Sequence, residues 1–135
     1  MDIHESLQCI LQAKDQLAIM FYDRLLDEYP EVRPYFDKVD FGRQRILLTT
    51  ALMIVERYYT NPTPAIEQYL QYLGTRHNEL GIPRATYASW IITMIETMRR
   101  FHGEQWSGEL EQQWQSAIDQ ARQLMFQGYD VHITV

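Results

Sequence analysis

The sequence predicts an all-α fold, and three features of the chain lead to that prediction. Apolar residues recur at intervals of three and four along most of its length, which is the period of an amphipathic helix. Proline and glycine stand mainly where these periodic segments stop, as they do at helix ends and corners. The segments differ in length and their connections are short, which favours oblique helix packing over a regular four-helix bundle. We expect six to seven helices in a single domain that spans residues 1–135.

The N-terminal part of the chain is predicted to form two helices and a corner. Residues 3–14 suit a short amphipathic helix, and Asp15 can cap a longer one that runs to Glu28. Pro30 ends this helix because its ring removes a hydrogen-bond donor. The next segment contains Pro34 and is expected to be a short helical turn followed by a corner. The inner face of the longer helix is expected to consist of Ala18, Phe21, Tyr22, Leu25 and Tyr29.

Two more helices are predicted in the middle of the chain. Asp40 can cap a helix that runs to about Tyr59, and the segment TNPTP (60–64) separates it from the next helix. Gly81 is the expected C-terminal cap of that second helix. The first of the two is expected to direct inward Gln44, Leu47, Leu48, Ala51, Leu52 and Val55. The second carries an inner stripe made of Ile66, Tyr69, Leu70, Leu73, Gly74, His77 and Leu80.

The C-terminal part of the chain is predicted to contain the last two helices. Pro83 suits a first-turn position, so it should open a helix that runs to about Phe101. Ser107 can cap a final helix that ends near Gly128. The expected inner residues of these helices are Tyr87, Ile91, Met94, Ile95 and Met98, then Leu110, Trp114, Ala117, Ala121, Leu124 and Met125. The tail DVHITV is rich in β-branched residues but has no partner segment, so it is expected to be irregular.

Composition and charge exclude several classes of function. The net charge is −6, and no basic cluster is larger than the pair Arg99 and Arg100, which argues against nucleic acid or an anionic membrane as a partner. The single cysteine, Cys9, excludes an internal disulfide and a thiolate metal cluster. The N-terminus MDIHESLQ is polar, so we expect no signal peptide and a cytoplasmic location. The chain could be a monomer or a weak dimer.

Three polar residues stand on predicted apolar faces, namely Tyr22, Gln44 and His77. Each of them has an ordinary structural explanation, because a buried histidine or tyrosine can simply satisfy the core and a glutamine near a helix start can point outward. Together they favour a pocket with one metal ligand and two hydrogen-bond donors. No HExxH motif or paired histidines accompany His77, so an ordinary zinc site is not expected. A lone inward histidine suits haem, whose other ligands belong to the macrocycle, and without a CxxCH motif the haem would be held non-covalently.

Three stretches of the chain resemble one known family. FYDRLLDEYPEVRPYFD (21–37) is similar to the second helix and following corner of single-domain bacterial haemoglobins and of the haemoglobin domain of flavohaemoglobins. FGRQRILLTTALMIV (41–55) resembles their distal helix, and YLGTRHNELGI, with the later Tyr87 and Trp114, resembles their proximal half. The resemblance extends from about residue 3 to 130. It implies a globin fold around haem b and reversible binding of diatomic gases such as dioxygen, nitric oxide and carbon monoxide.

The resemblance also implies a role for each residue that matches the family's motifs. His77 matches the proximal histidine that ligates the iron, while Tyr22 and Gln44 match the distal tyrosine and glutamine that act as hydrogen-bond donors to the gas. Phe36 matches the phenylalanine that stacks on the macrocycle. Leu48 matches the apolar residue that crowds the gas site. It also belongs to the remaining haem-contacting positions, which are Leu48, Leu73, Gly74, Ile82 and Tyr87. Gly74 is expected to be small because the haem approaches the helix there, and the second ring nitrogen of His77 is expected to bond to the Leu73 carbonyl.

Two departures from the family pattern bear on function. Flavohaemoglobins place a glutamate near the tyrosine that Tyr87 matches, and that position is Tyr129 here, with Asp130 next to it. Arg45 stands where the family often has a proline. A phenol in place of the glutamate predicts weaker oxygen activation, and nitric oxide oxidation would need a separate reductase. The alternatives are a haem-based gas sensor that acts through a partner protein and a haem-free interaction module with a globin fold.

Overall fold

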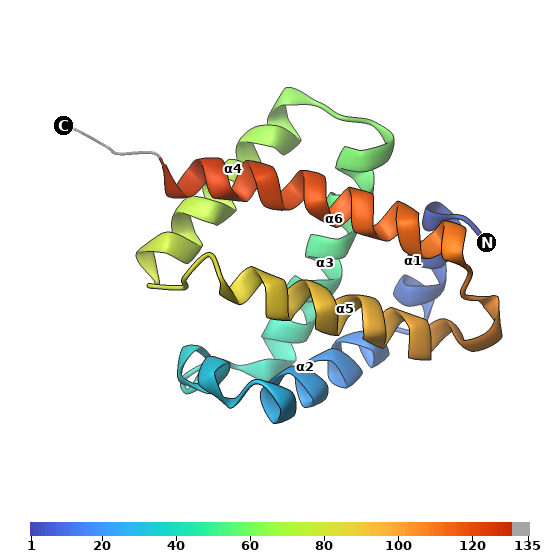
Figure 1. The fold of residues 1–135 in the computed structure, drawn as a ribbon, viewed down its shortest axis with the longest axis horizontal. Coiled ribbons are helices and arrows are strands. Elements are labelled where there is room, and N and C mark those ends of the chain that lie inside the picture. Colours follow the sequence, from blue (N-terminus) through green and yellow to red (C-terminus); the bar gives the residue numbers. More distant parts are fainter. Residues whose placement is uncertain (131–135) are drawn as a thin grey trace.

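The structure is a computed structural model that describes residues 1–130 as helices joined by short corners (Figure 1). Six α-helices and two short 3-10 helices follow one another as α1 (Ile3–Gln12), α2 (Gln16–Glu28), η1 (Pro30–Phe36), α3 (Phe41–Thr60), α4 (Pro64–Glu79), α5 (Thr86–His102), η2 (Gly103–Gln105) and α6 (Gly108–Tyr129). No strand occurs within residues 1–130, so the all-α prediction is confirmed. Nearly all of the tail that was expected to be irregular, residues 131–135, lies outside the described part of the chain.

The starts of α3 and α6 follow the predicted capping chemistry. The Asp40 carboxylate accepts a hydrogen bond from Gly42 N at 2.9 Å, and the Ser107 hydroxyl oxygen accepts one from Leu110 N at 3.1 Å. Both bonds satisfy backbone donors that a helix leaves free in its first turn. The helices therefore begin where the sequence placed them, and the start of α3 sets the direction in which Gln44 leaves the backbone.

α2 begins directly after Asp15, as predicted, but one predicted capping bond and one predicted helix start are wrong. Asp15 precedes α2 but makes no capping bond, because its carboxylate lies 3.0 Å from Nε of Arg45 on α3. Pro83 does not open a helix either. Thr86 N donates to the Pro83 carbonyl at 3.0 Å, which forms a turn, and α5 starts only after it. The Arg45 departure thus introduces an ion pair that joins α3 to the corner before α2.

The helices cross obliquely around one core. In Figure 1, α5 and α6 run side by side across the molecule, α2 lies along α5, and α4 crosses α6 near the C-terminal end of α6. The largest fully buried apolar side chains come from all six α-helices and include Ile10, Leu17, Phe21, Leu52, Leu70, Met94, Met98, Leu110 and Trp114. Among the described helices, none is long and apolar enough to cross a membrane.

The inner faces of α3 and α4 are narrower than the sequence period suggested. Leu47 is 49% exposed and Tyr69 is 43% exposed, although both were expected to point inward. Leu80 is 62% exposed because α4 has already ended at Glu79. Leu48 and Leu70 carry the apolar contacts instead, since they face the core directly.

The crossing of α4 and α6 brings two backbones into direct contact. A methyl group added at Gly74 would overlap the backbone of Met125, and one added at Gly128 would overlap the Gln71 carbonyl oxygen. The Thr75 hydroxyl strengthens the crossing by donating to the Gly128 carbonyl at 3.0 Å. The close approach that requires a glycine at position 74 is therefore to the backbone of α6, and the expected contact of Gly74 with a cofactor stays a prediction.

Candidate functional site

His77 lies in the last turn of α4, and its ring is half-buried. Its Nδ1 atom is 2.8 Å from the hydroxyl oxygen of Tyr87 in the first turn of α5. The two helices can approach because Gly81, with φ of 79°, reverses the chain between them. The expected partner of this nitrogen, the Leu73 carbonyl, is therefore wrong, since Tyr87 takes that place. Burial lowers the pKa of His77, so the imidazole is neutral at pH 7.

A second tyrosine, Tyr129 at the end of α6, packs against Tyr87. The two rings meet edge to face with their centroids 5.9 Å apart, and the Tyr129 hydroxyl donates to the Ile82 carbonyl at 2.7 Å. Burial and the nearby Tyr129 hydroxyl raise the pKa of Tyr87. Burial also raises the pKa of Tyr129. Both phenols therefore keep their protons, and the side chains behind His77 are uncharged.

Arg84 closes the outer end of this pair of phenols. Its guanidinium carbon lies 5.4 Å from the ring centroid of Tyr129 and 5.5 Å from that of Phe126. The same guanidinium pairs with the Asp130 carboxylate on the exposed side. Asp130 therefore pairs with Arg84, and Tyr129 is the residue that lies next to Tyr87. Sequence reasoning missed Arg84, although a cation in the corner opposite an acidic helix end was a readable signal.

Tyr22 and Gln44 form a second cluster, on α2 and α3. Tyr22 is 5% exposed, and the Gln44 amide donates from Nε2 to its hydroxyl oxygen at 3.0 Å. Burial raises the pKa of Tyr22, and the bond from Gln44 offsets part of that rise. Because the phenol oxygen accepts from Gln44, its own hydrogen remains available to another acceptor. The two side chains act in series, with Gln44 orienting Tyr22, whereas the sequence had suggested two parallel donors.

Two phenylalanines frame the Tyr22 ring. The centroid of Phe36, at the end of η1, lies 5.5 Å from that of Tyr22, and the centroid of Phe41, at the start of α3, lies 5.6 Å away. The two phenylalanine rings stack on each other with centroids 5.9 Å apart. The sequence had identified Phe36 and missed Phe41. Phe41 could have been found from its position, because it is an aromatic residue directly after the capping Asp40 and one turn before Gln44.

The remaining predicted contact positions lie beside these clusters. Leu48 is 5% exposed and lies one turn after Gln44 on the same face of α3. Leu73 is partly buried one turn before His77, and Ile82 is partly buried where its carbonyl receives the Tyr129 hydroxyl. Apolar side chains thus accompany both polar clusters.

A single hydrogen bond connects the segment that carries Phe36 with the corner after α4. The Tyr35 hydroxyl in η1 donates to the Gly81 carbonyl at 3.3 Å. Consequently the Tyr22 cluster, formed by α2, η1 and α3, is joined to the His77 cluster, formed by α4, α5 and α6, at this edge. The chemistry available is a neutral imidazole on one side and an oriented phenol hydroxyl on the other.

A family model described as Globin matches residues 19–125, a span that contains all the predicted site residues. No curated protein matches the chain.

Proposed function

The chain belongs to the globin family, whose members bind haem, and from that membership we propose that it holds haem b non-covalently and binds dioxygen reversibly. The observation that carries the proposal is the arrangement of His77, whose Nδ1 atom bonds to Tyr87 at 2.8 Å. The second support is the buried Tyr22 hydroxyl, which Gln44 orients at 3.0 Å. A gas binder of this kind needs one neutral axial ligand and one oriented donor, and the chain offers both.

The residues present fit haem. Burial lowers the pKa of His77 and favours the neutral ring, whose lone pair can ligate a metal. Within residues 1–130, Nε2 of this ring has no hydrogen-bond partner, so it is the nitrogen left for iron. In that tautomer Nδ1 carries the hydrogen and donates to the Tyr87 oxygen, which fixes the ring. Phe36, Leu48, Leu73 and Ile82 would supply the aromatic and apolar contacts.

Ferrous haem, when bound, supplies the iron at which diatomic gases coordinate. The protein decides how long such a gas stays. Dioxygen gains negative charge on binding, so the Tyr22 hydroxyl can donate to it, and a bond to a charged acceptor is worth about 1.5 to 3 kcal/mol. Carbon monoxide gains less charge and should benefit less. The Tyr22 and Gln44 pair therefore favours slow release of dioxygen in particular.

The proximal side chains favour reversible binding over oxygen activation. Behind His77 lie two protonated tyrosines, Tyr87 and then Tyr129, and the Tyr129 hydroxyl donates to the Ile82 carbonyl. A carboxylate in the same place would draw the Nδ1 hydrogen away from the ring and make His77 a stronger electron donor. The Arg84 cation beside Tyr129 acts in the opposite direction. Oxidation of nitric oxide with electrons from a separate reductase is a second candidate, favoured by the same slow release of dioxygen.

The test is an absorption spectrum of the purified protein with added haem, first ferric and then ferrous, before and after exposure to oxygen. A sharp Soret band that shifts reversibly with oxygen is the expected result. A band that appears but does not respond to oxygen would refute gas binding. The lack of any band would leave a globin fold without its cofactor and would favour the interaction module.

A further inference from the structure

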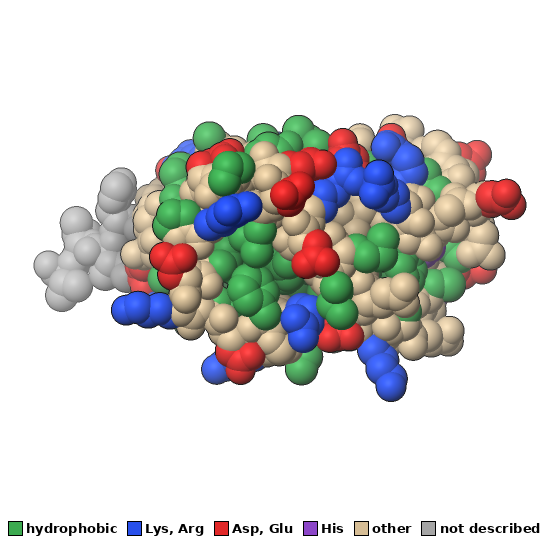
Figure 2. Space-filling model, turned by 90° about the horizontal axis from the view of Figure 1, so that it is seen from below, with side chains coloured by type: hydrophobic (Ala, Val, Ile, Leu, Met, Phe, Trp, Pro, Cys, Tyr) green, Lys and Arg blue, Asp and Glu red, His purple; other side chains and the backbone are tan. Residues whose placement is uncertain are grey.

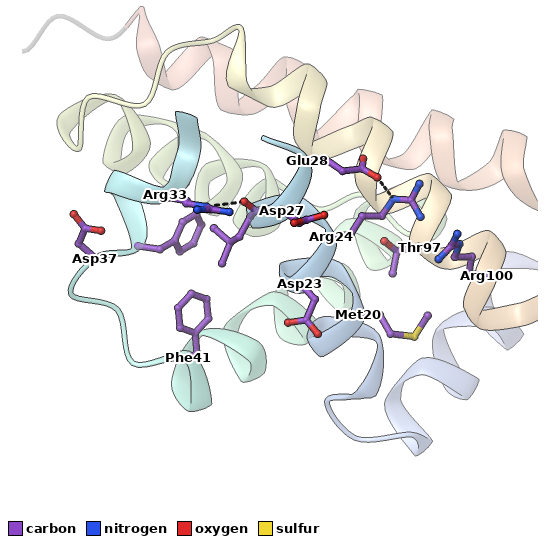
Figure 3. A pocket seen from close by; sticks show the side chains of 12 residues that line it. Met20, Asp23, Arg24, Asp27, Glu28, Arg33, Asp37, Phe41, Thr97 and Arg100 are labelled. Atoms are coloured by element: carbon purple, nitrogen blue, oxygen red, sulfur yellow. Dashed lines mark hydrogen bonds and ion pairs between the residues drawn. The ribbon is translucent and has the colours of Figure 1, made fainter. Parts of the chain in front are cut away.

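A groove runs along the outer side of α2 and is separate from the His77 cluster. It encloses about 1060 Å³ between α2, η1, the start of α3 and the end of α5. Figure 2 shows hydrophobic side chains gathered on the lower face of the molecule, with acidic and basic side chains around them. The close-up in Figure 3 shows Phe41 rising from the start of α3 toward the side of α2 that carries Met20 and Asp23. The proposed gas site does not explain this groove.

The apolar wall of the groove includes the two rings that frame the distal tyrosine, together with Met20 and Leu26. Phe36 and Phe41 both line the groove. Both also contact the Tyr22 ring, with centroids 5.5 Å and 5.6 Å away. Displacement of these two side chains would therefore bring a small molecule in the groove to the Tyr22 ring. Neither ring is fully buried, and rotations of partly exposed side chains are fast compared with gas binding.

The short connection between η1 and α3 explains why the groove is open. Only residues 37–40 join Phe36 to Phe41, and the backbone there makes a single turn bond, from Val39 N to the Phe36 carbonyl at 3.2 Å. So short a segment cannot cover the outer face of α2. Charged side chains stand on that face instead, among them Asp23, Arg24 and Asp27.

The Arg24 cation in the groove is already paired with carboxylates, and the lining carries more acidic than basic side chains, which argues against an anionic ligand. Arg24 lies between two carboxylates, with Nε 3.3 Å from Glu28 and a terminal nitrogen 2.7 Å from Glu96. Arg33 donates from Nε to the Leu26 carbonyl at 2.8 Å. An anion would have to break the ion pairs of Arg24 to bind there. A small uncharged molecule needs no such change and would contact only the apolar wall.

We infer that diatomic gases reach Tyr22 through this groove, by displacement of the Phe36 and Phe41 rings. The inference rests on the proposed gas binding and adds the path that the gas takes. A path affects arrival and departure alike, so it changes both rate constants by the same factor and leaves the affinity unaltered. The hydrogen bond from Tyr22 acts differently, because it slows departure alone.

Flash photolysis of the carbon monoxide complex and stopped-flow oxygen release test the path through substitutions of Phe41. Phe41→Trp should lower the association and dissociation rate constants together by at least about threefold, and Phe41→Ala should raise both, well within the range seen for variants of one site. The matched control is Leu47→Trp, at an exposed position of the same helix that does not line the groove. Unchanged rates in Phe41→Trp, with slower rates in Leu47→Trp, would overturn the inference and place the path beside Gln44.

A change confined to the dissociation rate in the Phe41 variants would also overturn the inference, because it would mean that Phe41 only supports Tyr22. Xenon provides a readout that does not depend on haem. Crystals pressurised with xenon should show an atom against Phe36 and Phe41 in the wild-type protein and none there in Phe41→Trp. Xenon found only at other places would overturn the path even if oxygen binding is confirmed. Wild-type protein that binds xenon here but no oxygen would refute the proposed function instead.

Discussion

The two sides of the candidate site treat their key polar groups differently. On the distal side, Gln44 donates to the Tyr22 oxygen, so the phenol hydrogen remains free for a ligand. On the proximal side, the Tyr129 hydrogen ends on the Ile82 carbonyl, and no carboxylate stands in the position next to Tyr87. Under the proposed function, the Tyr22 hydroxyl can stabilise a partly charged gas, whereas the proximal side chains do not strengthen electron donation by His77. This difference suits a protein that keeps dioxygen without activating it.

The largest expected effect comes from removing the proximal ligand altogether. His77→Ala should reduce haem affinity by more than the roughly 10–100-fold that loss of an outer hydrogen-bonding partner costs a metal site. The haem affinity is measured by transfer of haem to an acceptor protein, which is monitored through the Soret band. His4→Ala is the matched control, because the His4 side chain is 64% exposed. Equal haem retention in the two variants would mean that His77 is an ordinary core histidine.

The next largest effect is on stability and tests how the proximal helix is held. Gly74→Ala would push its methyl group into the backbone of Met125, so it should destabilise the fold by about 1–3 kcal/mol and shift α4 with its histidine. Urea unfolding measures the free energy. Gly108→Ala is the control, since a methyl group there meets no atom within 4 Å. If both variants unfold at the same urea concentration, the backbone contact between α4 and α6 does not exist in solution.

A smaller effect isolates the distal donor. Tyr22→Phe removes the hydroxyl that Gln44 orients, so dioxygen should dissociate about tenfold faster, with little change for carbon monoxide. Stopped-flow displacement of oxygen measures the rate. Tyr58→Phe removes a phenol on the outside of α3 and should change nothing. An unaltered oxygen rate in Tyr22→Phe would mean that the hydroxyl does not reach the gas.

The smallest expected effect comes from adding the carboxylate that the proximal side lacks. Tyr129→Glu places a carboxylate behind Tyr87, so His77 should donate electrons more strongly, with rate changes below about tenfold because a phenol lies between. The iron–histidine stretching frequency, measured by resonance Raman spectroscopy, should rise. Tyr129→Phe removes the bond to Ile82 without adding charge and serves as the comparison. Identical frequencies in both variants would show that Tyr129 does not influence His77.

Much of the fold was readable because capping residues and breaks are local features. Asp40 and Ser107 begin their helices as predicted, since the bonds involved span only a few residues. The capping role of Asp15 was misread because its partner lies on another helix, whereas Pro83 was misread because it begins a turn and α5 starts only after that turn. The Asp15 carboxylate bonds to Arg45 on another helix, and no period in the sequence reports such a pairing.

Spacing in the sequence identifies candidate residues but does not show how they bond to one another. His77, Tyr22 and Gln44 each interrupt an apolar stripe, so they could be found from spacing. Their hydrogen-bond partners could not, because the bond of His77 to Tyr87 depends on the corner that joins two helices. Gly74 shows the same limit, since only the crossing with α6 reveals what its missing side chain makes room for.

The contact of Gly74 and Gly128 with opposing backbones also determines which genetic changes the protein tolerates. Every missense change in a glycine codon adds at least a β-carbon, and at both positions that carbon would overlap backbone atoms that cannot rotate away. Selection would therefore remove variants at these two codons for a steric reason alone. In a population, both positions should look as invariant as the histidine, and invariance alone would not distinguish a chemical role from a steric one.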